Sequence, residues 1–285
     1  KSEFAIKLAR KVKGEIINAD SMQIYKDLRI LTARPLKEDL KKIKHHLYGF
    51  QDSKKDFSVG DWLKIATKKI EEIRKRKKIP ILVGGTGLYF KALTEGLVKI
   101  PNIPLIYRKN IRNLHRKLGP KKFYSKLIKL DPLVKNKINP LDTQRVIRAY
   151  EVKSFTKKSL YDWYKNTKAD FEKEDFFKIC IDFPRTELIK QINLRVKNMV
   201  KNGAILEVKK FDALRVPKTN TASKAIGLEV IRHYLAQKIH ISELIEKISI
   251  KTRQYAKRQA TWARGSMTEW KRIKSIELNK FLKKI

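Results

Sequence analysis

Three segments of this chain carry residues whose types and spacing suit a phosphorylated substrate. Lys1-Ser2 leads directly into an apolar stripe at helical spacing, as the last residues of a phosphate-binding loop do. Asp20 ends one short apolar run, and Gly84 to Gly87 form a Gly-Gly-Thr-Gly turn after another. A lysine, a hydroxyl, a carboxylate and a glycine turn together could bind phosphate groups and Mg²⁺. Each also has an ordinary alternative, because Lys-Ser can be an arbitrary start and an aspartate or a glycine turn often serves only a tight connection.

The elements that must position these residues follow the pattern of a parallel α/β sheet. The apolar runs 15–20 and 81–83 predict buried parallel strands. Helical spacing precedes each strand, at 4–12 and at 61–78, and returns at 88–97. Ligands bind at the carboxyl ends of such strands, so we expect the aspartate and the glycine turn to converge there.

Several further elements are predicted around this sheet. Gly14 is expected to cap the first helix. The segment 21–55 shows no regular pattern. Strand character returns at 177–181, and long helices fill most of the chain after it. Tyr255 and Trp262 lie seven residues apart and could be either core residues or an exposed stacking surface.

The middle of the chain follows a different pattern. Between Pro101 and Lys178, prolines interrupt short lysine-rich helical segments without a convincing strand. We therefore predict an all-helical insertion at 108–177, within a core domain made of 1–107 and 178–285.

Composition bounds the function. The 68 basic and 29 acidic residues give a net charge of +39, which favours a polyanionic partner, although a lysine-rich composition also arises from genome base bias. The single cysteine, Cys180, excludes an internal disulfide framework and is predicted to be a small buried apolar residue. One cysteine also fits a reducing compartment, so we expect a cytoplasmic protein. No apolar run is long enough to cross a bilayer, and we expect no membrane contact. His45-His46 lack further ligands at metal-binding spacing and are predicted to be structural.

Five segments, in order along nearly the whole chain, together resemble the tRNA dimethylallyltransferase family. They are Asp20-Ser21-Met22-Gln23-Ile24-Tyr25, His45-His46-Leu47, Val83-Gly84-Gly85-Thr86-Gly87-Leu88-Tyr89, Gln144-Arg145-Val146-Ile147-Arg148 and Lys257-Arg258-Gln259-Ala260-Thr261-Trp262-Ala263-Arg264. The resemblance implies a P-loop NTPase-like α/β core with an all-helical insertion. It also implies Mg²⁺-dependent transfer of a dimethylallyl group from dimethylallyl diphosphate to N6 of the adenosine 3′ of the anticodon, in tRNAs that read codons starting with U.

The resemblance assigns chemical roles to five residues. An exocyclic adenine amine is a poor nucleophile, so Asp20 is expected to take its proton as general base. The departing diphosphate gains negative charge, which Lys1, Thr86 and Arg108 are expected to meet, with Ser2 as the Mg²⁺ ligand. Thr86 and Arg108 are thus expected to be both catalytic and diphosphate-binding.

The resemblance also implies a tRNA anticodon stem-loop as partner, with the target base swung out of its stack. A monomer is expected. Ser223-Lys224-Ala225-Ile226-Gly227 resembles a further tRNA-contacting stretch of the family. The residues expected to contact tRNA are Asp20, Ser21, Met22, Gln23, Thr86, Arg108, Gln144, Arg145, Val146, Ile147, Arg148, Lys257, Arg258, Gln259, Trp262 and Arg264.

The family pattern departs from this sequence at its start. The motif requires six residues before Lys1 and a hydrophobic strand before those. We therefore expect an N-terminally truncated chain that lacks the first strand and most of the P-loop, poorly folded or inactive until that segment is restored.

Alternative functions remain open at this point. An adenylate isopentenyltransferase shares the core motifs but is expected to lack the insertion and the late basic helix. A P-loop ATPase or kinase would account for Lys1-Ser2 and Asp20 only. A non-catalytic RNA-binding protein would account for the charge.

Overall fold

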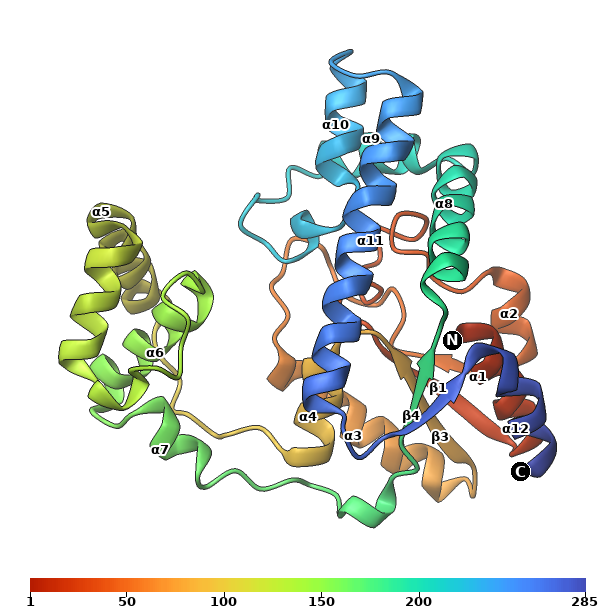
Figure 1. The fold of residues 1–285 in the computed structure, drawn as a ribbon, viewed down its shortest axis with the longest axis horizontal. Helices are drawn as coiled ribbons and strands as arrows, with labels where there is room; N and C mark the ends of the chain where they lie inside the picture. Colours follow the sequence, from red (N-terminus) through yellow and green to blue (C-terminus); the bar gives the residue numbers. More distant parts are fainter. The chain divides into compact units, whose positions relative to one another are not determined.

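The computed structural model describes residues 1–285 and divides them into two compact units (Figure 1). An α/β unit contains Lys1–Thr94 and Phe171–Ile285, and a helical unit contains Glu95–Asp170. The sequence placed the insertion at 108–177, so each boundary of the helical unit lies earlier in the chain than predicted.

A three-stranded parallel sheet forms the centre of the α/β unit. Strand β1 (Gly14–Ala19) lies between β2 (His45–His46) and β3 (Ile79–Gly84). Ile16 is paired with His45 on one side and with Ile81 on the other. The two long strands are those predicted from apolar runs, whereas β2 was missed because two residues carry no periodicity.

The two faces of β1 explain why all six of its residues are buried. Successive side chains of a strand point to opposite faces. Ile16 packs against helix α1 (Ser2–Lys11), and Ile17 packs against α3 (Val59–Lys75) and α4 (Gly87–Glu95). Figure 1 shows these helices around the sheet. A strand covered on both faces needs a continuous apolar run, which is the pattern that the sequence showed.

The predicted role of Gly14 was wrong. Helix α1 ends two residues earlier, with Val12 as its C-cap, and Lys13 takes the left-handed conformation at φ 52°. Gly14 is instead the first residue of β1, where a Cβ atom would lie 2.8 Å from the carbonyl oxygen of Ile79. Close approach of the neighbouring strand therefore requires the glycine.

A second, separate pair of parallel strands completes the α/β unit. Strand β4 (Ile179–Asp182) pairs with β5 (Lys271–Lys274), residue for residue. The strand predicted at 177–181 is confirmed with shifted ends. β5 was missed because only Ile273 of its four residues is apolar and buried.

Four helices of the α/β unit that follow β4 form a separate helical layer with its own apolar core (Figure 1). The residues 24–31, from the segment predicted to be irregular, contribute Ile24, Tyr25, Leu28 and Leu31 to that core. The helices of this layer are α8 (Arg185–Lys201), α9 (Ala204–Ala213), α10 (Leu228–Leu235) and α11 (Ile241–Ser266), with η3 (Ala222–Lys224) before α10. The remaining elements are α2 (Lys37–Lys42), η2 (Lys173–Asp175), η4 (Ser275–Glu277) and α12 (Leu278–Lys284).

The helical unit has a small core of its own and no strand. Helix α5 (Leu105–Leu130) is broken at Gly119, and it packs against α6 (Thr143–Thr156) through Phe123 and Tyr150. Two shorter elements complete the unit, α7 (Leu160–Tyr164) and η1 (Pro132–Val134). Across the whole chain, the structure shows no helix of sufficient length and apolar character for a membrane span.

Candidate active site

The backbone of Asp20 is fixed by a buried neighbour, Asn18. Asn18 is fully buried, and its Oδ1 atom accepts a hydrogen bond from the Asp20 amide at 2.9 Å. Its Nδ2 atom donates to the carbonyl oxygens of Asp20 and Leu47, both at 3.0 Å. Sequence reasoning missed Asn18, although an asparagine inside a buried strand must find partners for its amide and can be flagged on that ground.

The carboxylate of Asp20 lies in a half-buried position just past the end of β1. Burial raises its pKa, and this effect outweighs the amides of Met22 and Gln23 and the charge of Lys1, which all act to lower the pKa. The Met22 amide donates to Oδ1 at 2.9 Å. A carboxylate with a raised pKa is a better proton acceptor than an ordinary aspartate.

Thr86 joins the two strand ends, as the sequence predicted. Its amide donates to the carbonyl oxygen of Ala19 at 3.2 Å. Its Oγ1 atom accepts from the Ser21 amide at 2.9 Å and donates to Ser21 Oγ at 3.2 Å. The ends of β1 and β3 are thus connected directly beside Asp20.

The glycines around Thr86 make room for helix α11. A Cβ atom on Gly85 would lie 2.1 Å from Gln259 Nε2, and one on Gly87 would lie 2.2 Å from the Trp262 ring. Gln259 Nε2 also donates to the carbonyl oxygen of Gly85 at 2.7 Å. The turn was interpreted from sequence as a phosphate site, but at these two positions it is a docking surface for α11.

Tyr255 is a site residue whose place the sequence left open. It is half-buried on α11, and burial raises the pKa of its hydroxyl, as does the nearby charge of Asp20. Hydrogen bonds with Gln259 and Thr86 act in the opposite direction. The guanidinium of Arg258 lies 5.7 Å from the centre of its ring. Trp262 is also half-buried, so both aromatic residues belong to the contact between α11 and the glycine turn.

The charged residues expected on α11 point outward. Lys257, Arg258 and Arg264 are exposed, whereas Gln259 is half-buried by its contact with the glycine turn. Long, exposed cations on one helix suit contacts with phosphates rather than a folded core.

Lys1 and Ser2 lie at the beginning of α1. Burial of the Lys1 ammonium lowers its pKa, and the opposing charge of Asp20 raises it. Arg195 and Cys180 also act on this ammonium. Ser2 is exposed in the first turn of the helix. The expected strand and loop before Lys1 concern residues outside this chain and stay predictions.

The side chains near Asp20 limit how Mg²⁺ could bind. No three His, Cys, Asp or Glu side chains gather in the chain as a metal-binding group. Mg²⁺ usually keeps several waters and takes one or two protein ligands together with substrate phosphates. Exposed Ser2, next to Lys1 in the chain, fits that kind of site and does not form a protein-only metal centre.

The remaining predicted residues lie in the helical unit. Arg108 is on α5, and Gln144 to Arg148 are on α6. Val146 is only 1% exposed and Ile147 is half-buried against the same core, so both side chains support the helix. The expected contacts of Val146 and Ile147 with tRNA stay predictions.

A buried acid, Glu151, interacts electrostatically with three arginines of the helical unit. Its carboxylate lies 3.5 Å from Arg148 Nη1, and the charges of Arg108 and Arg112 act on it as well. Burial nevertheless raises its pKa. Glu151 was missed from sequence because its partners on α5 are far away along the chain.

Two lesser predictions have definite outcomes. His46 Nε2 forms a hydrogen bond of 2.7 Å with Glu15 Oε2, so this histidine has a structural partner. Cys180 is half-buried rather than buried, with Arg272 Nη1 4.0 Å from its sulfur, because β4 lies in a two-stranded sheet with little cover.

Fold and site together define an α/β protein of the P-loop NTPase-like class, with acid, hydroxyl and basic groups at the carboxyl ends of two strands. The family model described as IPP transferase matches residues 23–266. A tRNA dimethylallyltransferase of Pelagibacter ubique is 57% identical over 285 residues, which is 100% of this chain and 91% of that protein. The chain therefore belongs to the IPP transferase family.

Solved structures agree with this assignment. The tRNA isopentenylpyrophosphate transferase of Bacillus halodurans has a TM-score of 0.69 at 30% identity, covering 99% of this chain and 90% of that one. A eukaryotic dimethylallyltransferase, captured acting on tRNA, has a TM-score of 0.79 at 29% identity, covering 92% of this chain and 66% of that one.

Proposed function

We propose that this protein transfers the dimethylallyl group of dimethylallyl diphosphate to N6 of the adenosine 3′ of the anticodon in tRNA. The observation that carries the proposal is Asp20, a half-buried carboxylate with a raised pKa, beside the Thr86 hydroxyl. The 57% identity to a tRNA dimethylallyltransferase supports the same chemistry.

Asp20 is the general base in this proposal. The N6 lone pair is delocalised into the adenine ring, so the amine attacks the allylic carbon only as its proton leaves. A pKa above the ordinary value lets the carboxylate hold that proton better. The Met22 amide and Asn18 keep the base at the end of β1.

The diphosphate leaves with growing negative charge. Lys1, Thr86 and Arg108 supply the positive charge and the donor for it, and Ser2 would be the protein ligand of Mg²⁺. When bound, the ion neutralises part of the charge on the diphosphate.

The tRNA anticodon stem-loop contacts the segment that starts at Asp20 and the exposed cations of α11. Arg145 and Arg148 add charge from the helical unit. Exposed arginines and lysines bind phosphates, while the half-buried ring of Trp262 supplies a stacking edge. We further propose that the protein acts as a cytoplasmic monomer.

One experiment separates this function from its alternatives. The full-length gene product is incubated with labelled dimethylallyl diphosphate and Mg²⁺, and with either tRNA or AMP. We expect label on tRNA and none on AMP. Label on AMP alone would show an adenylate isopentenyltransferase, and label on neither would overturn the proposal.

A further inference from the structure

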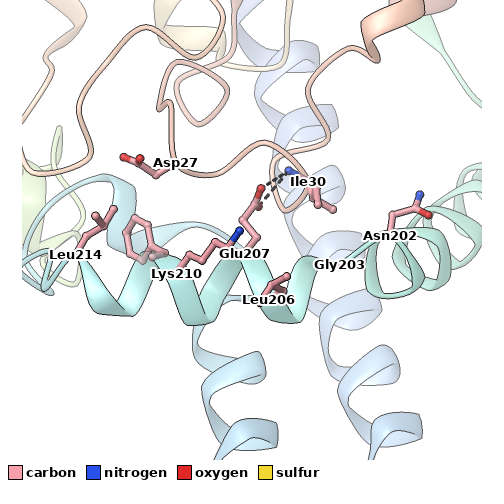
Figure 2. A pocket seen from close by; sticks show the side chains of 9 residues that line it. Asp27, Ile30, Asn202, Gly203, Leu206, Glu207, Lys210 and Leu214 are labelled. Atoms are coloured by element: carbon pink, nitrogen blue, oxygen red, sulfur yellow. Dashed lines mark hydrogen bonds between the residues drawn. The ribbon is translucent and has the colours of Figure 1, made fainter.

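The carboxylate of Glu207, on helix α9, binds three consecutive backbone amides of a distant loop. It accepts hydrogen bonds from Arg29 at 2.8 Å, from Ile30 at 2.8 and 3.1 Å, and from Leu31 at 2.8 Å. Figure 2 shows the carboxylate turned toward Ile30 beside a surface cavity. Consecutive amides around one anion form a nest, and a charged acceptor strengthens each bond.

The amides of residues 29–31 depend on Glu207 for their hydrogen bonds. The loop 28–34 is not helix or strand, and its backbone bonds run from the Ala33 amide to the Ile30 carbonyl and from the Arg34 amide to the Arg29 carbonyl. A backbone amide that loses its hydrogen-bond acceptor lowers the stability of the fold unless water takes the place of that acceptor.

Apolar contacts hold the same loop against α9 without fixing its conformation. Leu28 and Leu31 are buried in one cluster with Val208 and Phe211. Such contacts are not directional, whereas the amide nest allows one backbone path. Glu207 therefore sets how the loop lies on the helix.

The loop is connected to the proposed active site by Gln23. Gln23 Nε2 donates to the carbonyl oxygen of Thr32 at 2.9 Å and to that of Ala33 at 3.1 Å. The carbonyl oxygen of Gln23 accepts from the Gly49 amide at 2.9 Å. Gln23 lies three residues after Asp20, so the loop that Glu207 holds also holds the segment proposed to read tRNA.

We propose that Glu207 is a positioning residue for tRNA recognition: it fixes the loop 29–33, and through it the side chain of Gln23. The proposal rests on the proposed function. It predicts an effect on tRNA affinity that is larger than any effect on dimethylallyl diphosphate, because Glu207 bonds to amides 29–31 and to none of the groups assigned to the diphosphate.

The test uses two variants and a matched control in the full-length gene product. Glu207→Gln keeps one oxygen and turns an NH₂ group toward amide donors, and Glu207→Asp keeps the carboxylate on a shorter side chain. Glu229→Gln removes the same charge from neighbouring α10, where Glu229 is exposed and pairs only with Lys251 at 3.3 Å. KM for each substrate, kcat, thermal unfolding and hydrogen exchange of amides 29–31 are measured.

We expect Glu207→Gln to raise KM for tRNA by about tenfold, with KM for dimethylallyl diphosphate changed less than about twofold. Glu207→Asp should recover part of the loss, Glu229→Gln should match the wild type, and amides 29–31 should exchange faster in Glu207→Gln only.

Three results would overturn the proposal. These are an unchanged KM for tRNA in Glu207→Gln, an equal loss for both substrates that follows the loss of thermal stability, and unchanged exchange of the three amides. If Glu207→Gln does not fold, Glu207→Asp decides by the same criteria. Absence of transfer by the wild type would instead contradict the proposed function, while the exchange measurement would still test the nest.

Discussion

The two ends of strand β1 carry acidic residues in opposite surroundings. Glu15, at the beginning, is 1% exposed and lies 2.7 Å from both His46 and Arg76 and 3.1 Å from Lys78. Asp20, just past the other end, is held by backbone amides and has one nearby ammonium, that of Lys1.

The surroundings move the two pKa values in opposite directions. Burial raises the pKa of Glu15, but hydrogen bonds from His46, Lys78 and Arg76 outweigh burial and lower the pKa to about 2. At Asp20 burial prevails and the pKa is raised. Glu15 is therefore a fixed negative charge that joins β1 to β2 and to the turn between α3 and β3, and Asp20 is a carboxylate able to take a proton.

The largest expected effect comes from Asp20→Asn, which removes the proton acceptor. We expect the rate of transfer in single turnovers to fall by about 10³-fold, with little change in tRNA affinity. Stability should not fall, since a partly buried charge disappears. Asp52→Asn, at an exposed acid paired with Lys26, is the control. Normal turnover of Asp20→Asn would refute its role as base.

The complementary change is Glu15→Gln, which should lower stability but not chemistry. We expect a loss of about 2 kcal/mol in unfolding free energy, less than for a fully buried pair because Arg76 and Lys78 are half exposed. Denaturant unfolding measures this, and the transfer rate per folded molecule should match the wild type. A slowed rate in folded protein would show that the two ends of β1 are not independent.

The pH dependence of stability tests the same contrast. Because the folded pKa of Glu15 is lowered, its contribution is complete above 4.5, the ordinary value for glutamate, and is lost as pH falls toward about 2. The unfolding free energies of wild type and Glu15→Gln should therefore converge over that window. A constant difference between them down to pH 2 would contradict the lowered pKa.

A smaller effect is expected at the contact between the glycine turn and α11. Gly87→Ala places a methyl group against the rigid Trp262 ring, which should cost about 1–2 kcal/mol and slow transfer by moving α11. Gly265→Ala is the matched control, because no atom lies within 4 Å of the added carbon. Equal stability and rate in both variants would mean that α11 docks without this contact.

The smallest effect is expected from Arg258→Ala on the exposed face of α11. It should weaken tRNA binding and reduce the slope of log affinity against log salt by about one. Binding measured between low and moderate salt gives the slope. An unchanged slope would place Arg258 outside the RNA contact.

The sequence predicted the convergence of Asp20 and Thr86 because parallel strands bring their carboxyl ends to one edge. It could not predict Glu207, whose partners are 176 to 178 residues away along the chain, or Glu151, whose arginines lie partly on another helix. Gly14 was misplaced because a glycine after an apolar helix favours a cap, and the close approach of Ile79 is a tertiary contact.

The amino-acid sequence by itself determined the long strands, the helical middle of the chain and the residue types available at the strand ends, because these follow from local periodicity and chain order. Only the tertiary structure decided the protonation behaviour of each acid. A pKa depends on burial and on the distance to charges from other elements, so Glu15 on β1 and Asp20 just past its end differ through neighbours that no local pattern encodes.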